Sequence, residues 1–384
     1  MTAEEREIEW EIMESTVFKT ARESFPIMDR LSEKLSERGT LASLVLGWNC
    51  HLTEITALAV KALAATGCRL LMSECNPATS EEQSIDYMRE CGALVFTGEN
   101  ARSKVLEAGP QVVSDTGFDL LSAYLETGGS GLLGASEITT SGIQRLRRLR
   151  QGTDFPVINL NDGIIKSRIE NFHGVGGGVV ESLSRLVHRD WGGARVAVVG
   201  YGMVGQGVAS YLRRLGPRVL IVDSDPVARL LAHYDGYEIA SLDEAARCEL
   251  VVTATGRRGL IGEDFFARAA NSLILLNVGH WPDEIDVKKL KQICSKVEAI
   301  GPDLERFTLA DPLRSLYLAC SGNPANVAML TGSIEPTLLH LTTEILSMEF
   351  IYLHHRSLEM GENALPRSIE EEVSELALSL IGMI

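Results

Sequence analysis

The feature that most constrains this chain is a glycine fingerprint that follows an apolar strand. The β-branched run at residues 196–199 predicts a buried parallel strand, and Gly200, Gly202 and Gly205 follow it at G-x-G-x-x-G spacing. The first glycine allows a tight turn, the second lets the backbone approach a pyrophosphate, and the third lets the helix pack on the strand. The pattern therefore predicts a strand, a turn and a helix that together bind a dinucleotide.

A carboxylate at the end of the next strand specifies which dinucleotide is expected. Apolar residues 219–222 lead into Asp223, about twenty residues after the glycines, where a carboxylate accepts hydrogen bonds from both ribose hydroxyls. It would repel a 2′-phosphate, so NAD is favoured over NADP. Met203 and Val204 open the helix, whose free N–H groups and dipole attract phosphates. A purely structural glycine turn is the alternative, but the surrounding strand, helix and acid favour the binding site.

Length, charge and cysteine content narrow the class of protein. A chain of 384 residues is expected to form two domains, and a net charge of −16 argues against nucleic acid or an anionic membrane as the main partner. A charged N-terminus and the absence of an eighteen-residue apolar run predict neither a signal peptide nor a spanning helix. Seven scattered cysteines without a C-x-x-C pair indicate reduced thiols and a cytoplasmic protein. The eight histidines show no ligand spacing, so no metal site is expected.

Strands and helices alternate in the first part of the chain. After an amphipathic helix at residues 4–38, the apolar runs predict strands at residues 41–46, 69–72, 93–96, 111–114, 131–136 and 156–161. Alternation of this kind predicts an open parallel sheet, in which ligands bind at the carboxyl ends of the strands. His51, Asn76, Thr116 and Thr139 fall at such ends.

The later pattern predicts that one domain is inserted into the other. Strands at residues 250–253 and 273–276 continue the dinucleotide domain, and the loops after them carry Thr255, Asn277 and His280 toward the cofactor. Long helices at residues 335–353 and 369–381 are expected to return to the first domain. The predicted fold is α/β, with two Rossmann-like doubly wound domains: NAD-binding residues 178–326, inserted in a discontinuous substrate domain of residues 1–177 and 327–384.

Two short segments near the first boundary leave alternatives open. Lys166, Glu170 and Asn171 lie at positions i, i+4 and i+5 of a predicted helix, which places them on adjoining positions, although such a polar face is usually only solvated. Four glycines within residues 174–178 suit a hinge or a plain loop.

Taken together, these motifs resemble those of the S-adenosylhomocysteine hydrolase family, over residues 46 to about 376. The similar motifs are C-H-L-T at 50–53, C-N at 75–76, E-I-T-T-S-G at 137–142, N-L-N-D at 159–162, K-S-R-I-E-N at 166–171, G-Y-G-M-V-G at 200–205, N-V-G-H at 277–280 and E-I-D-V at 284–287.

The resemblance implies a concealed redox cycle. In this family, tightly held NAD oxidises the ribose 3′-hydroxyl, the ketone makes the C4′ proton acidic, the 5′-thiol leaves, water adds and the hydride returns.

Lys166 matches the lysine at the 3′-hydroxyl, and His51 matches the histidine that handles protons at the 5′ side. Glu170 stands where the family has aspartate, and Asn171 is present. The resemblance assigns Thr139, Thr140, Asn277 and His280 to the cofactor side, where the loop position of Thr255 also places that residue. It assigns to the substrate side Thr53, Asn76, Asp115, Thr116, Asn161 and Ser333.

The chain departs from the family at the substrate site. On the simplest alignment Thr116 replaces an acid–base aspartate, and a threonine hydroxyl is no base near neutral pH. Ile138 replaces a glutamate, Ile55 removes a hydrogen bond to the adenine amino group, and Ser333 replaces a histidine near the base. Val175 replaces a cysteine at the hinge. The family's C-terminal tail, which reaches a neighbour's NAD, is missing after Ile384, so we expect a homodimer or tetramer without tail exchange.

Three readings follow from this pattern. The first is an NAD enzyme that acts on a nucleoside or related polyol, a small-molecule substrate. It oxidises a secondary hydroxyl through Lys166 and His280, with His51 nearby, and with or without C5′ elimination and hydration. The second is an ordinary S-adenosylhomocysteine hydrolase in which Asp115 or Asp119 supplies the lost acid. The third is a non-catalytic, NAD-binding regulatory paralogue. Retention of Lys166, His51 and His280 weighs against the third, and the altered base-binding groups weigh against the second.

Overall fold

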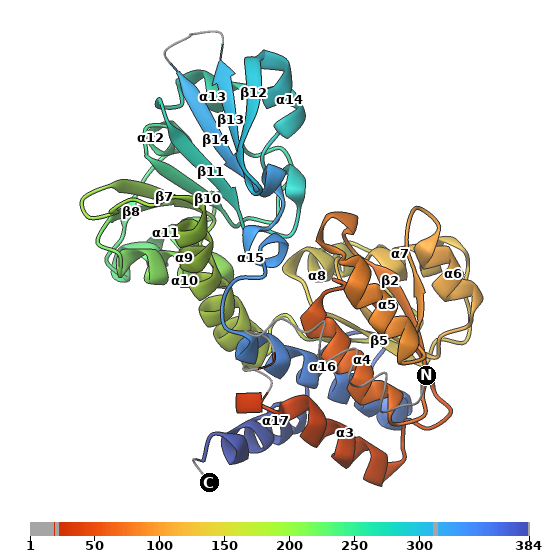
Figure 1. Ribbon diagram of the computed structural model, residues 1–384. Coiled ribbons are helices and arrows are strands. Elements are labelled where there is room, and N and C mark those ends of the chain that lie inside the picture. Colours follow the sequence, from red (N-terminus) through yellow and green to blue (C-terminus); the bar gives the residue numbers. More distant parts are fainter. Residues whose placement is uncertain (1–18, 20–22, 310–313, 383–384) are drawn as a thin grey trace. The chain divides into compact units, whose positions relative to one another are not determined.

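The chain forms two compact units. A computed structural model describes residues 19, 23–309 and 314–382, and Figure 1 shows its elements. Unit 1 comprises Met1–Lys166 and Ile334–Ile384, and unit 2 comprises Ser167–Ser333. The sequence places these two boundaries at 177/178 and 326/327. Most of the N-terminal part of the helix expected at residues 4–38 lies outside the described residues.

Unit 1 is built on a seven-stranded parallel sheet. The strands lie in the order β15-β6-β5-β4-β1-β2-β3, and each neighbouring pair is parallel. Their bounds are β1 (Val45–Cys50), β2 (Arg69–Glu74), β3 (Leu94–Phe96), β4 (Val112–Asp115), β5 (Gly134–Glu137), β6 (Pro156–Asn159) and β15 (Gly361–Ala364). The edge strand β15 comes from the C-terminal part of the chain and was not predicted, because it contains no β-branched or aromatic residue.

Helices cover both faces of this sheet. The helices of unit 1 are α3 (Ile27–Arg38), α4 (Glu54–Ala64), α5 (Glu82–Glu90), α6 (Ala101–Glu107), α7 (Asp119–Glu126), α8 (Thr140–Arg147), α16 (Ile334–His354) and α17 (Arg367–Leu380), with short turns η1 (Pro77–Thr79) and η5 (His355–Ser357). On one face, Val113 and Ala135 of the strands join a core with Phe118, Tyr124 and Leu146 of the α7 and α8 region. Helix α16 packs against β4 and β5. Successive side chains of a strand point to opposite faces of the sheet. The residues next to Val113 and Ala135 therefore point to the other face, and α16 packs against that face.

Unit 2 is an eight-stranded sheet with a doubly wound centre. Its strand order is β12-β13-β14-β11-β10-β7-β8-β9, parallel from β14 to β9, with β12, β13 and β14 antiparallel. The bounds are β7 (Arg195–Val199), β8 (Arg218–Val222), β9 (Glu238–Ile239), β10 (Leu250–Thr253), β11 (Leu273–Asn277), β12 (Cys294–Gly301), β13 (Leu304–Leu309) and β14 (Ser315–Ala319). The strand order reverses at β7 and β10, which is where such sheets bind their ligand. The predicted α/β class with parallel, Rossmann-like sheets is confirmed.

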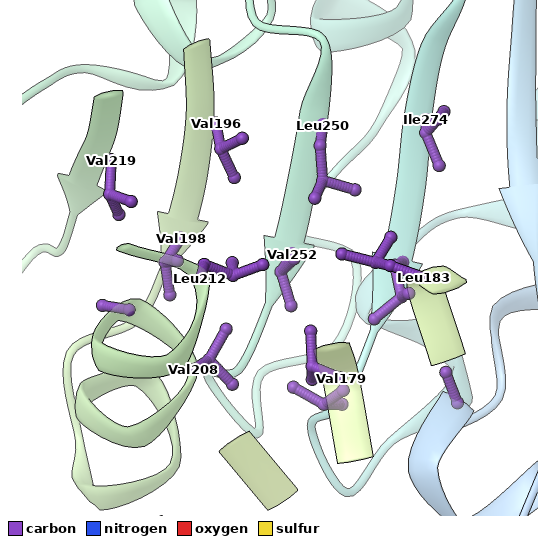
Figure 2. Packing of buried hydrophobic residues seen from close by; sticks show 14 of the residues in the cluster. Val179, Leu183, Val196, Val198, Val208, Leu212, Val219, Leu250, Val252 and Ile274 are labelled. Atoms are coloured by element: carbon purple, nitrogen blue, oxygen red, sulfur yellow. The ribbon is translucent and has the colours of Figure 1, made fainter. Parts of the chain in front are cut away.

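Two helices pack their apolar stripes on the centre of this sheet. Figure 2 shows Val179 and Leu183 of α9 (Val175–Leu186) and Val208 and Leu212 of α10 (Met203–Arg213) over valines and leucines of the strands. The other helical segments are η2 (Ile165–Gly174), α11 (Pro226–Tyr234), α12 (Leu242–Ala245), α13 (Glu263–Arg268), η3 (Pro282–Glu284), α14 (Val287–Ile293), η4 (Cys320–Gly322) and α15 (Ala325–Ala328). Burial of this apolar layer is what stabilises the strand and helix on either side of the glycine fingerprint.

The glycine-rich segment 174–178 is not a loop. Its residues from Val175 onward form the first turns of α9. A Cβ on Gly176 would lie 2.9 Å from the carbonyl oxygen of Gly207 in α10, and a Cβ on Gly207 would lie 2.2 Å from the carbonyl oxygen of Phe172. The glycines therefore let helical backbones approach one another, so the plain-loop interpretation is wrong.

Three further features concern the class of protein: membrane-spanning helices, disulfide bonds and clusters of metal ligands. Within the described residues no helix has the length and apolar character needed to cross a membrane. The seven cysteines are free thiols. No cluster of three or more potential metal ligands occurs in the described part of the chain.

Candidate functional site

The fingerprint of unit 2 forms an open backbone turn at the end of β7. Gly200 has a φ of 101°, and a Cβ there would lie 2.6 Å from the carbonyl oxygen of Ala254. A Cβ on Gly205 would lie 2.0 Å from the carbonyl oxygen of Gly200, so helix and turn are in backbone contact. A Cβ on Gly202 would meet no described atom within 4 Å. The turn is thus closed on its inner side and open where a ligand would approach.

The first turn of α10 offers its backbone N–H groups to that open side. Helix α10 begins at Met203, followed by Val204, and no side chain of the described residues caps it at Gly202. Four N–H groups at a helix start lack intrahelical partners, and the helix dipole adds positive character there. This arrangement binds phosphate without any basic side chain.

Asp223 is held in place at the end of the neighbouring strand. Its Oδ2 accepts a hydrogen bond from the Tyr201 amide at 2.7 Å, and its Oδ1 accepts one from the Asp225 amide at 2.8 Å. Arg257 donates to Ser224 Oγ beside it, at 3.2 Å. The carboxylate is therefore oriented by backbone and stands next to the fingerprint turn, as a ribose-binding acid requires.

The loops after β10 and β11 are organised by a buried glutamate and a buried asparagine. Glu284 Oε2 accepts from the amide and hydroxyl of Thr255, at 3.1 and 2.9 Å, and burial raises the pKa of Glu284. Asn277 is fully buried, accepts from Thr253 Oγ1 at 3.0 Å and donates to the carbonyls of Trp281 and Gly322. The side chains of Thr255 and Asn277 thus shape the loops from inside.

Together these features fit NAD. Gly200, Gly202, Gly205, Met203 and Val204 form the turn and helix start for the pyrophosphate, and Asp223 stands where the ribose hydroxyls would be held. The ring of His280 lies in the loop after β11, with its centroid 4.5 Å from that of Trp281.

In unit 1, His51 is linked to the loop that follows β2. His51 Nδ1 lies 2.6 Å from Thr79 Oγ1, and the Thr79 hydroxyl donates to the carbonyl of Asn76 at 2.9 Å. Because the single hydroxyl proton is used there, Nδ1 of His51 must donate to Thr79. In the neutral ring Nε2 then carries the lone pair, which is the form of a histidine that accepts a proton.

Asn76 and Thr116 each hold a buried polar atom without a protein partner in the described residues. Asn76 Oδ1 accepts from the Ala78 amide at 3.0 Å, whereas its Nδ2 has no partner, and Thr116 Oγ1 has none either. Buried polar groups normally find a partner, so these two atoms are suited to a ligand or water. Thr53 is also buried, 3.4 Å from Thr56 through the two hydroxyl oxygens.

Asp115 and Glu137 are used internally. Asp115 accepts from Asn49 Nδ2 and the Thr116 and Leu121 amides, each at 2.8 Å. Burial raises the pKa of Asp115 to about 6. Glu137 accepts from the backbone at Gly117, Phe118 and Thr139, and burial with the neighbouring Asp115 raises its pKa to about 8. Both carboxyls therefore hold the loops at the strand ends.

Thr139, Thr140 and Asn161 lie near the ends of β5 and β6. Thr139 caps α8 by accepting from the Gly142 amide at 2.9 Å, and Thr140 Oγ1 donates to Asn161 Oδ1 at 2.9 Å. Lys166, Glu170 and Asn171 lie on η2, which is a π-helix. Its hydrogen bonds span five residues, so positions four and five apart share one side, and π-helical turns are frequent at functional sites. Ser333 is exposed at the last position of unit 2.

Sequence reasoning missed two polar residues on α16. His340 and Glu344 are 4% and 1% exposed, and Glu344 Oε1 accepts from Trp48 Nε1 at 2.6 Å and from the Ser114 hydroxyl. The available signal was a histidine and a glutamate at i and i+4 within a largely apolar helix. Burial is the largest influence on the pKa of each residue, and the charge of Lys166 adds a smaller lowering contribution to both.

Comparison with known proteins agrees with this geometry. The family described as "S-adenosyl-L-homocysteine hydrolase, NAD binding domain" matches residues 171–332, which indicates NAD as the cofactor. The S-inosyl-L-homocysteine hydrolase of Methanopyrus kandleri is 30% identical over 380 residues, covering 94% of this chain and 89% of that protein. The adenosylhomocysteinase of Aquifex aeolicus is also 30% identical over 380 residues, covering 94% and 90%. The S-inosyl-L-homocysteine hydrolase of Methanosarcina acetivorans is 29% identical over 399 residues, covering 98% and 95%.

The similarity extends over nearly the whole length of each relative, so it includes both units of this chain. The glycine fingerprint of unit 2 and the sheet edge of unit 1 therefore occur together in these related enzymes. The chain is therefore a member of the S-adenosyl-L-homocysteine hydrolase family.

Proposed function

We propose that this protein is an NAD-dependent enzyme that oxidises the ribose 3′-type hydroxyl of an S-nucleosylhomocysteine and then cleaves its C5′–S bond. The observation that carries the proposal is the carboxyl edge of the unit 1 sheet. There His51 is fixed as a proton acceptor at Nε2, and Asn76 and Thr116 present buried polar atoms without a protein partner in the described residues. Such atoms are what a hydroxylated substrate satisfies.

We further propose S-inosyl-L-homocysteine as the first substrate to test. Ile55 on α4 is partly buried and has no polar atom, so it offers no acceptor to the amino group of adenine. A site without that acceptor loses its preference for adenine over a base that carries a keto oxygen instead. The relatives from Methanopyrus kandleri and Methanosarcina acetivorans carry the name S-inosyl-L-homocysteine hydrolase.

Each proposed residue has a chemical task. The ammonium of Lys166 stabilises negative charge that develops on the alcohol oxygen, and Nε2 of His51 exchanges a proton at the 5′ side. Asn76 and Thr116 orient the sugar through hydrogen bonds, and Asn161 adds a polar group near the end of β6. Glu170 and Asn171 follow Lys166 on η2. When bound, NAD would accept the hydride that leaves the alcohol carbon.

The test is an absorbance measurement near 340 nm on NAD-loaded protein, with thiol release followed in parallel. We expect S-inosyl-L-homocysteine to reduce bound NAD and to release homocysteine. If S-adenosyl-L-homocysteine alone does so, the enzyme is an adenosylhomocysteinase, as is the Aquifex aeolicus relative by name. If neither these thioethers nor the free nucleosides reduce NAD that is shown to be bound, the protein is a regulatory paralogue and the proposal is wrong.

A substitution at Lys166 isolates the redox step. We expect Lys166→Ala to slow NAD reduction by about a hundredfold or more, because general acid–base and electrostatic groups contribute that order. NAD binding, measured by fluorescence titration, should not change, since the fingerprint lies elsewhere. Equal reduction by the variant and the parent would remove Lys166 from the mechanism.

A further inference from the structure

A buried polar cluster lies in the layer between α16 and the unit 1 sheet. It consists of Trp48, Ser114, Ser136, His340 and Glu344, each at most 4% exposed. Ser136 donates to Ser114 at 2.9 Å, Ser114 donates to Glu344, and Trp48 Nε1 donates to the same Glu344 oxygen at 2.6 Å. A carboxyl group and an imidazole in this layer cost free energy that apolar residues would not, so their presence calls for a reason.

The unused side of this cluster is the gap between Glu344 and His340. Trp48 and Ser114 both bond to Oε1, which leaves Oε2 facing His340 Nε2 at 3.6 Å. Neither ring nitrogen of His340 has a hydrogen-bond partner in the described residues. Burial, and then the charge of Lys166, lower the pKa of His340 well below its ordinary value, so the ring is neutral and the two residues are not an ion pair. A neutral ring has one N–H and one lone pair, and it can therefore pass a proton from one nitrogen to the other.

The surroundings of Glu344 allow it to change protonation near neutral pH. Burial raises the pKa of Glu344 to about 7, and the charge of Asp115 adds a smaller increase. The hydrogen bonds from Ser114 and Trp48 and the charge of Lys166 act in the opposite direction and lower the pKa. Burial, and then the charge of Glu344, raise the pKa of the Cys50 thiol, so this group stays protonated. Charged groups on the helices packed around α16 are engaged elsewhere, as in the bonds of Arg38 to Glu349 and Glu372 and of the Ile165 amide to Glu370.

Other carboxyl groups at this sheet are not equivalent. Asp115 accepts hydrogen bonds at both oxygens, two on Oδ1 and one on Oδ2, and Glu137 likewise accepts at both. Thr116 has only a hydroxyl. Glu344 alone among these three acids has an oxygen that faces an ionisable side chain without a bond to it.

We propose that Glu344 and His340 form an internal proton acceptor that works through Lys166. The inference rests on the proposed function. Oxidation of a secondary alcohol breaks a C–H bond, whose hydride goes to NAD, and an O–H bond, whose proton needs an acceptor. Lys166 takes the hydroxyl proton as it gives one of its own to Nδ1 of His340, while Nε2 of His340 gives its proton to the Glu344 carboxylate. The net change is one proton moved from the substrate oxygen to Glu344, and it returns when the hydride returns.

His340 and Glu344 are thus positioning residues, because they act on Lys166 and not on the substrate. Storage of the proton inside unit 1 suits a reaction in which the same alcohol is oxidised and later restored. The proton is then retained with the ketone, and solvent need not supply it.

The decisive experiment follows proton release during a single turnover. NAD-loaded protein at about pH 8, in weak buffer with an indicator dye, is mixed with the substrate that reduces NAD, and dye and 340 nm signals are recorded together. We expect the parent protein to reduce NAD before any proton reaches the dye. Glu344 is 1% exposed, so a proton on its carboxyl exchanges slowly with solvent, although its pKa of about 7 means that the proton leaves at equilibrium. Glu344→Gln should release one proton per NAD reduced and reduce NAD about a hundredfold more slowly, with loss of the ionisation near neutrality from its pH profile. His340→Asn should behave in the same way, and Glu344→Asp should restore part of the retention.

A matched control and an independent readout separate the possible failures. Glu349→Gln changes an equally buried glutamate of the same helix, which pairs with Arg38, and should retain the proton like the parent. Titration of ¹³C-labelled glutamate by NMR, without substrate, should show a carboxyl that ionises near pH 7, in addition to that of Glu137 at about 8, and the signal near pH 7 should be missing in Glu344→Gln. If the parent releases the proton as fast as it reduces NAD, or if Glu344 does not titrate near neutrality, the inference is wrong and the proposed function stands. If no substrate reduces NAD, both are wrong.

Discussion

One hydroxyl group determines which nitrogen of His51 can exchange a proton. Thr79 donates its only hydroxyl proton to Asn76, and this forces His51 to donate through Nδ1. No pattern in the sequence links Thr79 to His51, because the two are 28 residues apart and on different segments.

We expect Thr79→Val to slow thioether cleavage about tenfold or more while NAD reduction changes little. Valine has the shape of threonine but cannot accept from Nδ1, so the ring loses the bond that selects its tautomer. Homocysteine release and absorbance at 340 nm measure the two steps separately. Thr79→Ser, which keeps a hydroxyl, is the control, and parallel loss of both steps in the valine variant would contradict a role confined to His51.

Glu344 should make the stability of unit 1 depend on pH. Its pKa in the folded protein is about 7, above the ordinary value of 4.5, so the folded chain keeps a proton that the unfolded chain has already lost. Stability from this group is therefore greatest at low pH and declines as pH rises from 4.5 to about 7, by on the order of 3 kcal/mol. Glutamine can keep the bonds from Trp48 and Ser114 but does not titrate.

Accordingly, we expect Glu344→Gln to gain stability relative to the parent as pH increases from about 5 to about 8.5. Urea unfolding of both proteins at the two pH values, followed by tryptophan fluorescence, measures the difference. Buried acids that do not interact with Glu344 contribute equally to both proteins and cancel, whereas the smaller interaction with Asp115 is part of the measured difference. A stability difference that does not change with pH would mean that Glu344 keeps an ordinary pKa.

At the scale of elements, the contact between α9 and α10 depends on positions where no side chain fits. Gly207 and Gly176 bring the two helices together with the end of η2. Gly177, one residue along α9, is in a different situation, because a Cβ there would meet only a ring atom of Tyr211, at an ordinary 3.5 Å.

We therefore expect opposite effects from the same substitution. Gly207→Ala should destabilise unit 2 by about 1–3 kcal/mol or more, since backbone must move to admit the methyl group. Gly177→Ala should stabilise it by about 0.5–1 kcal/mol, because alanine is the better helix former. Thermal unfolding of the two variants in the NAD-free state checks both signs, and equal effects would mean that α9 and α10 do not pack as described.

At the scale of the whole molecule, α11 carries an apolar stripe that unit 2 does not cover. Val227, Leu230, Leu231 and Tyr234 are 71, 58, 43 and 81% exposed and lie at i, i+3, i+4 and i+7. We propose that a second copy of this chain covers the stripe in a homodimer or tetramer. Two α11 helices that pair antiparallel about a two-fold axis bring opposite ends of their dipoles together and bury the same residues on each.

Light scattering over a range of concentrations tests this proposal. We expect Leu230→Glu to yield a smaller species than the parent, because a charge in the centre of an apolar interface is costly to desolvate. Val297→Glu alters another exposed apolar residue of unit 2, on β12, and should keep the mass of the parent. An identical mass for the parent and Leu230→Glu would place any subunit contact elsewhere.

By itself the sequence determined the features that depend on residues close together in the chain. The glycine fingerprint, the buried strands around it and Asp223 lie within about thirty residues, so their spacing specifies a strand, a turn and a helix start without reference to the rest. The alternation of strands and helices likewise specified parallel sheets, because a parallel pair requires a crossover of this kind.

Only the tertiary structure decided which distant residues meet. The bonds of Glu344 to Ser114 and Trp48 join residues 230 and 296 positions apart, and β15 reaches β6 from the other end of the chain. A glutamate on this helix has the same local sequence whether its side chain faces solvent or the buried Trp48 and Ser114. Its pKa, and with it the chemistry proposed for this site, is set by burial and by neighbours that the folded chain alone brings together.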